Sequence, residues 1–385
     1  MDSFKKSFQH YIKWSALSAL SGFLAGIAAS IFLILLDLAT NYRDSHQKII
    51  WLLPAIGFLI GYIYHKYGKD SERGSNLILD EIHNPKKILP LRMAPFVLFG
   101  TVLTHLFGGS AGREGTAVQM GASLSDRLSH FFKIAANERK ILLVTGAGAG
   151  FGAAIGAPWA GMIFGMEVIS VGGFKLFALV ECFIASFVGY YTTIFLHAPH
   201  THYSALGNIE WTPSAFLYVA LAGVLFGVIS QLFIRFTHLI ENLQNKFVNY
   251  KPLRPVIGGL MLIALYALEG SYQYTGLGLH IIQSALLEKA SFLIPIFKGL
   301  FTAITIGSGF KGGEFIPLVF IGTTFGSFLS SVFPVSTQLL ASVGFAAVFA
   351  GASNTPLACS LMAIEIFGPQ ITPFAVLGCF LSYFF

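Results

Sequence analysis

A glycine-rich turn that carries one carboxylate is the pattern in this sequence best suited to chemistry. Residues 108–116 have the sequence Gly-Gly-Ser-Ala-Gly-Arg-Glu-Gly-Thr, and an apolar segment follows them. We expect a helix to begin there, with unpaired N–H groups and a partial positive charge that attract anions. Glu114 can occupy this position as the bound anion when it is ionised and leave it when it is protonated. The turn therefore predicts an anion site that is coupled to protons, with pairing of Glu114 to Arg113 or capping of the helix as the alternative.

A second glycine-rich turn opens another apolar helix. Residues 307–317 have the sequence Gly-Ser-Gly-Phe-Lys-Gly-Gly-Glu-Phe-Ile-Pro, with Glu314 at the expected helix start. An ionised carboxylate there would repel an anion, and burial near a second carboxylate favours the neutral acid. A protonated Glu314 could donate a hydrogen bond to an anion or carry a proton. The alternative is that Glu314 pairs with Lys311 or caps its helix.

A third candidate follows the charged segment 69–73. Gly74, Ser75, Asn76 and Leu77 precede an apolar stretch, and serine and asparagine are good N-cap residues. An anion site and a plain helix cap are equally open at this position.

The elements that position these turns are predicted from composition. The 385 residues are 55% hydrophobic and only 11% charged, with a mean hydropathy of +0.70, which excludes a soluble globule or a disordered chain. Long stretches lack charge altogether, namely residues 14–36, 141–166, 182–209 and 211–234. We therefore predict an all-α polytopic membrane protein. Several apolar windows are shorter than the roughly 20 residues of a simple span, which indicates broken and re-entrant helices.

Charge and repetition predict two halves inserted from opposite sides. Lysines precede the first apolar run, so we expect a cytoplasmic N-terminus and no cleaved signal, and the uncharged loop near residue 205 should lie outside. Residues 112–121 align with 313–322, and each half has a proline nine residues before a glutamate, at Glu167 and Glu365. This pattern predicts an inverted repeat, with a first membrane repeat over 1–205 and a second over 206–385.

The same motifs carry a family resemblance. The Gly-Arg-Glu-Gly run at 112–115 and the Gly-Glu-Phe-Ile-Pro run at 313–317 resemble two signatures of the CLC family of chloride channels and proton-coupled anion antiporters, and 74–78 lies where that family has a third. The resemblance spans nearly the whole chain. It implies a homodimer with one anion path per subunit and Glu114 as the gating and proton-coupling residue. The anion-binding residues it implies are Ser75, Asn76, Gly112, Arg113, Gly115, Gly313, Phe315 and Ile316.

Departures from the family pattern point towards its bacterial fluoride-exporting branch. Thr116 replaces the usual proline, and Glu314 is an added acid in the second signature. Val168 stands where chloride antiporters have an inner proton-transfer glutamate, and the fluoride branch also lacks that glutamate. Ile316 and Ser75 are closer to the chloride type. We expect fluoride/proton antiport that exports fluoride, with a chloride channel or chloride/proton antiporter of the same fold as the alternative.

Other functional classes have weaker support. Residues 108–112 match the Gly-x-Ser-x-Gly pattern of serine hydrolases, but an intramembrane hydrolase also needs a histidine–acid pair. The histidines at 197, 200 and 202 are more typical of a solvated loop than of a metal site. We expect no enzyme activity, cofactor, metal or nucleic-acid partner, no C-terminal regulatory domain, and insertion in the lipid bilayer of a bacterial inner membrane.

Overall fold

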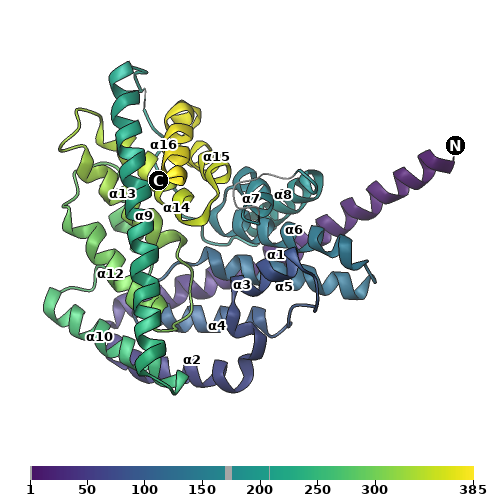
Figure 1. The fold of residues 1–385 in the computed structure, drawn as a ribbon, viewed down its shortest axis with the longest axis horizontal. Coiled ribbons are helices and arrows are strands. Elements are labelled where there is room, and N and C mark those ends of the chain that lie inside the picture. The colour runs from purple at the N-terminus through teal and green to yellow at the C-terminus, as the bar shows by residue number, and fades with distance from the viewer. Residues whose placement is uncertain (1, 170–175, 208) are drawn as a thin grey trace. The chain divides into compact units, whose positions relative to one another are not determined.

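The computed structural model of this protein describes residues 2–169, 176–207 and 209–385, and within these ranges it is helical without a named strand. Figure 1 shows this arrangement of helices. The helices of the first half are α1 (Asp2–Ser45), α2 (Leu53–Ile63), α3 (Ser75–His83), α4 (Met93–Leu106), α5 (Glu114–Phe131), α6 (Ala136–Ile155), α7 (Pro158–Glu167) and α8 (Leu179–Phe195). Those of the second half are α9 (Pro213–Phe247), α10 (Arg254–Glu269), α11 (Leu279–Ala285), α12 (Leu293–Gly307), α13 (Phe315–Leu329), α14 (Thr337–Ser353), α15 (Pro356–Phe367) and α16 (Thr372–Phe384).

Helix lengths confirm a polytopic membrane protein with broken helices. Four helical stretches are long and apolar enough to cross a bilayer, namely Gln9–Ser45, Gln47–His83, Pro213–Phe247 and Lys251–Glu269. Others are far shorter, since α7 has 10 residues and α11 has 7, whereas a span needs about 20. Short helices at membrane depth leave backbone groups that only protein or a watery cavity can satisfy.

The chain forms two compact units, and their boundaries do not follow the predicted halves. The first unit contains residues 1–34, 70–98 and 116–200, and the second contains 35–69, 99–115 and 201–385. The predicted boundary between residues 205 and 206 separates sequence repeats, whereas these units are defined by contacts. The repeat boundary therefore stays a prediction.

The first unit is tied together by a buried polar network around Arg139. The guanidinium donates to both carboxylate oxygens of Asp126, at 2.5 and 2.7 Å, and to Glu81 Oε2 at 2.9 Å. Asp126 also accepts the N–H of Leu89 at 2.6 Å. Buried charges are tolerated when they are paired and hydrogen-bonded in this way. The network therefore fastens the end of α3 and the segment after it to α5 and α6.

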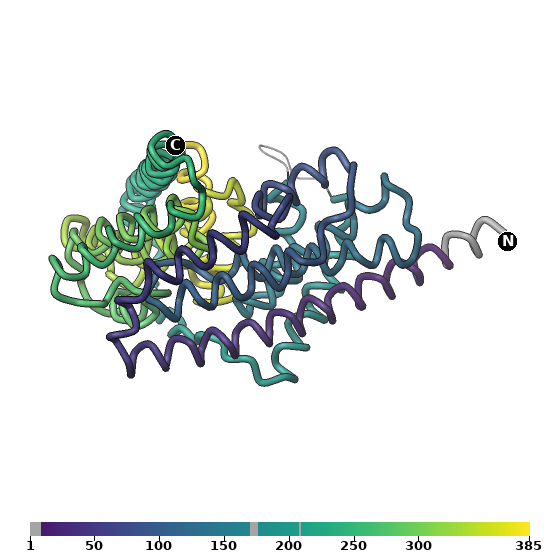
Figure 2. Tube along the Cα trace, turned by 90° about the horizontal axis from the view of Figure 1, so that it is seen from below, coloured from purple at the N-terminus to yellow at the C-terminus, as the bar shows by residue number. Residues whose placement is uncertain are grey.

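The second unit is built around α9, which packs against α12, α14 and α16. Figure 1 shows α9 along its length, and Figure 2 looks nearly down its axis. The Thr212 hydroxyl caps its start by accepting from the N–H of Ala215 at 3.2 Å, and Pro213 occupies the first turn, where a missing N–H costs nothing.

The sequence repeat reappears as one packing pattern used twice. Gly121 of α5 and Gly146 of α6 approach so closely that a Cβ on either would collide with the carbonyl oxygen of the other, and Gly322 of α13 and Gly344 of α14 do the same. In the series α5 to α8, both α7 and α8 pack against α6. In the series α13 to α16, both α15 and α16 pack against α14. Small residues thus set equivalent close helix crossings in the two series.

Candidate functional site

The two glycine-rich turns lie against each other in the second unit. Gly112 N donates to Gly313 O at 2.6 Å, and Gly313 N donates to Gly112 O at 2.8 Å, which makes an antiparallel bridge. A Cβ added at Gly112 would lie 3.0 Å from Gly313 O and 3.1 Å from Ile316 N. Glycine is therefore needed for this approach, and the bridge places the first turn directly beside the first N–H groups of α13.

Glu114 closes back on its own turn. It begins α5 with 1% of its surface exposed, and its Oε1 accepts from Arg113 Nε at 3.2 Å. Its Oε2 accepts from the backbone N–H of Arg113, also at 3.2 Å. Arg113 Nη2 donates in turn to Thr201 Oγ1 at 3.4 Å. The carboxylate thus takes the place of a bound anion at a helix start, and the ion pair with Arg113 is part of the same arrangement.

Glu314 lies one position earlier in the second turn, at the residue that aligns with Arg113, and its side chain is held differently. It is the N-cap residue of α13, and its side chain makes no capping hydrogen bond. Lys311 instead places its ammonium over the Tyr64 ring, 4.1 Å from the centroid. Phe315 and Ile316 are buried in the first turn of α13, where backbone N–H groups have no partner within the helix.

The third predicted helix start differs from the prediction in one respect. Gly74, with φ 55°, is the N-cap residue of α3, so Ser75 and Asn76 are its first two helical residues, and of the two open alternatives the side-chain cap is not formed. The backbone there has a conformation that favours glycine, so a side-chain cap would be strained. Gln119 Nε2 donates to Ser75 Oγ at 3.3 Å, which leaves the serine hydroxyl hydrogen free to donate.

The motifs of other functional classes do not assemble. Ser110 is fully buried, and its hydroxyl lies 2.9 Å from Thr302 Oγ1. Among the described residues, no group of three or more metal-ligating side chains is close enough to hold an ion. The three cysteines are buried, as expected for core residues.

Two buried basic side chains in the second unit, Arg43 and Lys298, were not predicted from the sequence. Arg43 donates to His105 O at 3.0 Å and to Asp44 Oδ1 at 2.7 Å. Lys298 is fully buried and donates to Gly276 O at 2.7 Å and to Tyr274 O at 3.2 Å. Lys298 is the only charged residue of α12, and a lone intramembrane charge is a signal for function that sequence alone could have supplied.

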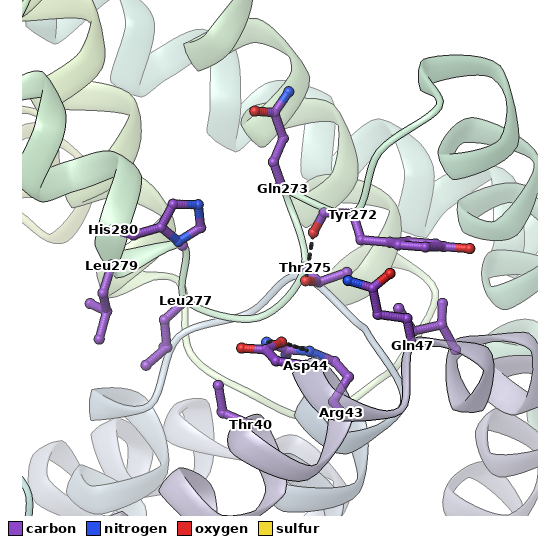
Figure 3. A pocket seen from close by; sticks show the side chains of 12 residues that line it. Thr40, Arg43, Asp44, Gln47, Tyr272, Gln273, Thr275, Leu277, Leu279 and His280 are labelled. Atoms are coloured by element: carbon purple, nitrogen blue, oxygen red, sulfur yellow. Dashed lines mark hydrogen bonds and ion pairs between the residues drawn. The ribbon is translucent and has the colours of Figure 1, made fainter.

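Arg43 and Asp44 border a pocket of about 430 Å³ between the end of α1 and the segment that leads into α11. Figure 3 shows Arg43 and Asp44 on one side of it and His280 on the other. None of its lining residues belongs to the predicted site, but Gly276 N, in the segment that lines it, donates to Gly109 O at 3.0 Å. Burial lowers the pKa of His280, which lies outside the helical stretches that are apolar enough to span a membrane.

A polytopic α-helical membrane protein with repeated broken helices is the class that the fold and these turns define. The profile described as voltage gated chloride channel matches residues 56–385. The chain is 44% identical over 382 residues to a chloride/fluoride channel protein of Pseudomonas syringae pv. tomato, covering 96% of this chain and 83% of that protein. It therefore belongs to the voltage-gated chloride channel family, the CLC family.

Solved structures agree with this assignment. The fold matches the crystal structure of a CLC-type fluoride/proton antiporter with a TM-score of 0.94 and 34% identity, covering 97% of this chain and 95% of that chain. A slow cyanobacterial Cl⁻/H⁺ antiporter matches with a TM-score of 0.84 and 19% identity, covering 96% and 93%, which concerns the fold alone. An H⁺/Cl⁻ exchange transporter of Vibrio vulnificus is 27% identical over 390 residues, covering 91% of this chain and 81% of that protein. The predicted family and its all-α fold are confirmed.

Proposed function

We propose that this protein exchanges fluoride for protons across a bacterial inner membrane and exports fluoride from the cell, with its N-terminus in the cytoplasm. The observation that carries the proposal is the bridge between the two turns, which sets the closed carboxylate of Glu114 beside a second helix start that carries Glu314. Similarity to a protein described as a fluoride/proton antiporter favours fluoride as the anion.

In this proposal Glu114 is the gate. When it is ionised, it holds the N–H group that an anion would otherwise use, and when it is protonated it no longer competes for that site. In this proposal Arg113 and Gly115 supply backbone donors in one turn, and Phe315 and Ile316 supply them in the other. Gly112 and Gly313 belong to the same site, but their N–H groups hold the two turns together. Ser75 and Asn76 supply further donors at the start of α3. Fluoride is small and strongly hydrated, so several close donors are needed to replace its lost water.

Glu314 takes the second proton-linked role. Val168 cannot titrate, so a proton that passes to the cytoplasm while fluoride is exported needs another carboxyl group. The absence of a capping bond on Glu314 leaves its carboxyl group available to gain and lose a proton or to donate to fluoride.

The decisive experiment is anion flux from liposomes that hold the purified protein, with fluoride and chloride compared and proton movement recorded at the same time. Fluoride efflux accompanied by opposite proton movement supports the proposal. Fluoride efflux without proton movement indicates a channel instead of an exchanger.

Chloride transport is the second candidate. Ser75 is the chloride-type residue in the resemblance stated above, and the Pseudomonas relative is described as a chloride/fluoride channel protein. Chloride carried as fast as fluoride would favour this candidate.

We further propose a homodimer with one anion path per subunit, two inverted repeats over 1–205 and 206–385, and no enzyme activity or need for a cofactor, metal ion or nucleic acid. The family resemblance supports the dimer, and crosslinking of purified protein in detergent tests it. Fully active protein that stays monomeric would contradict it.

A further inference from the structure

The last part of α9 packs directly on the turn that leads to Glu314. Gln244 Nε2 donates to Ser308 Oγ at 3.1 Å. One residue earlier in the turn, a Cβ added at Gly307 would lie 2.9 Å from Ile240 Cβ and 3.0 Å from Thr237 O. Residues 237–244 of α9 and the start of the 307–314 turn are therefore in backbone-level contact.

Gln244 carries an unused acceptor at this contact. The residue is 6% exposed, and its Oε1 accepts no hydrogen bond from any residue that the structure describes. A buried amide oxygen without a partner costs roughly 1–3 kcal/mol, so such a group calls for an explanation. An acceptor beside the Ser308 hydroxyl can serve a mobile donor, such as water carrying a proton.

Titratable side chains of α9 lie on the same stretch. His238 and Glu241 are both exposed, and the charges of both act on the carboxyl group of Glu314. Lys311 on the turn itself is engaged with the Tyr64 ring. Beyond Glu241 on the same side of the molecule, Arg254 donates to Val248 O at 3.0 Å.

The length of α9 places these groups at the aqueous boundary. Its 35 residues span about 52 Å at about 1.5 Å per residue, whereas the hydrocarbon core is about 30 Å thick. The uncharged residues 213–234 account for that core, so the helix beyond Arg235 extends past it. Because cytoplasmic segments of membrane proteins carry an excess of Lys and Arg, we expect this end of the helix to face the cytoplasm.

We propose that Glu241, with His238 beside it, is the cytoplasmic entry group of the proton path, through which protons leave and reach Glu314 along the Gln244–Ser308 contact. The inference rests on the proposed function, in which Glu314 exchanges a proton during transport. While fluoride is exported, the Glu314 O–H bond breaks as intervening water passes a proton onward, and a new O–H bond forms on Glu241. Glu241 then gives its proton to cytoplasmic water and is left ionised. When a fluoride gradient of opposite sign drives exchange in reverse, hydronium protonates Glu241 and the same steps run backwards to Glu314.

The test is the Glu241→Gln variant in liposomes, measured as fluoride-driven proton movement in the reverse direction, which takes protons from the cytoplasmic face. Exchange should slow by roughly tenfold to hundredfold at about pH 7.5, because a positioned proton donor has been removed. The rate should recover at about pH 5, where hydronium is concentrated enough to reach Glu314 directly, and the proton-to-fluoride ratio should not change. Glu210→Gln is the matched control, an exposed acid just before the other end of the same helix, and should match the unmutated protein.

Restoring a titratable group separates proton delivery from structure. Glu241→His should recover exchange with a pH dependence moved towards about 6.5, the ordinary value for histidine. Gln244→Leu should slow exchange in the same pH-dependent way while the gel-filtration profile stays unchanged.

Two results would overturn the inference, and a third concerns the proposed function alone. Glu241→Gln at the unmutated rate over the whole pH range, in a protein that Glu314→Gln slows, excludes Glu241 as the entry group. A loss in Glu241→Gln that neither acid nor histidine restores marks a structural role. Unmutated protein that moves fluoride without protons refutes the function on which the inference rests.

Discussion

The two glycine-rich turns share a backbone arrangement and differ in how each holds its carboxylate. Both precede a helix, and each donates one backbone hydrogen bond to the other at Gly112 and Gly313. In the first turn Glu114 is bound to the backbone and side chain of Arg113. In the second, Glu314 makes no capping bond, and its surroundings include the charges of His238 and Glu241.

This difference suggests a division of labour between two acids that lie at neighbouring positions of similar turns. A carboxylate that occupies donors competes with an anion, so Glu114 is suited to gating. A carboxyl group that occupies no backbone donor can exchange protons without opening or closing the anion site, so Glu314 is suited to proton supply. The predictions below test this division, from the largest expected effect to the smallest.

Glu114→Gln should abolish proton movement, because an amide cannot titrate. Fluoride flux should stall or become passive, according to whether the amide still holds the Arg113 N–H group. Simultaneous recording of fluoride and pH in liposomes measures both quantities. Coupled exchange that survives intact would end the distinction between the two acids.

Gly313→Ala should strongly reduce transport by separating the two turns. A Cβ at this position would lie 2.9 Å from Gly115 N, and such overpacking typically costs about 1–3 kcal/mol. The measurements are fluoride flux and thermal stability in detergent. Gly207→Ala is the matched control, since a Cβ there meets nothing within 4 Å, and it should change neither quantity.

Glu314→Gln should slow fluoride exchange by roughly tenfold or more and disturb its proton coupling, as expected on removal of a positioned acid. Folding should be little affected, because the side chain makes no capping bond that the amide would lose. Flux assays and gel filtration check the two expectations. Exchange at the unmutated rate would leave Glu114 as the only acid of the pair with a function.

Ser75→Ala should have the smallest effect, a weakening of apparent fluoride affinity by roughly tenfold, at the lower end of the about 1.5–3 kcal/mol that one hydrogen bond to a charged group contributes. Because Gln119 occupies an acceptor site of this hydroxyl, its hydrogen is free for an anion. Ser75→Thr keeps the hydroxyl and should stay close to the unmutated protein. An equal loss of fluoride affinity in both variants would mean that Ser75 acts through its packing and not by donating a hydrogen bond to the anion.

Much of the fold could be predicted from the sequence because it depends on local composition. Uncharged runs determine which segments enter a membrane, and glycine-rich turns before apolar runs determine where α5 and α13 begin. The repeat was visible as well, because equivalent small residues such as Gly121 and Gly322 recur at equal spacing in the two signatures.

The cap of α3 shows where local rules fail. Serine and asparagine are preferred caps in general, yet Gly74 takes the position because the backbone there needs a conformation that side chains rarely allow. Propensity is a weak preference that tertiary packing overrides. The Arg139 network escaped prediction for a related reason, since Glu81, Asp126 and Arg139 are separated in sequence and meet only after their helices pack.

The sequence by itself determined the membrane class, the repeat, the family and the identity of the two acids, because each follows from residue type and spacing along the chain. Only the tertiary structure decided that Gly112 meets Gly313, that Glu114 binds its own turn while Glu314 does not, and that α9 lies against the turn before Glu314. These are contacts between residues as many as 201 positions apart. Their distances depend on how helices cross, and helix crossing is set by the combined packing of many side chains, which no single motif specifies.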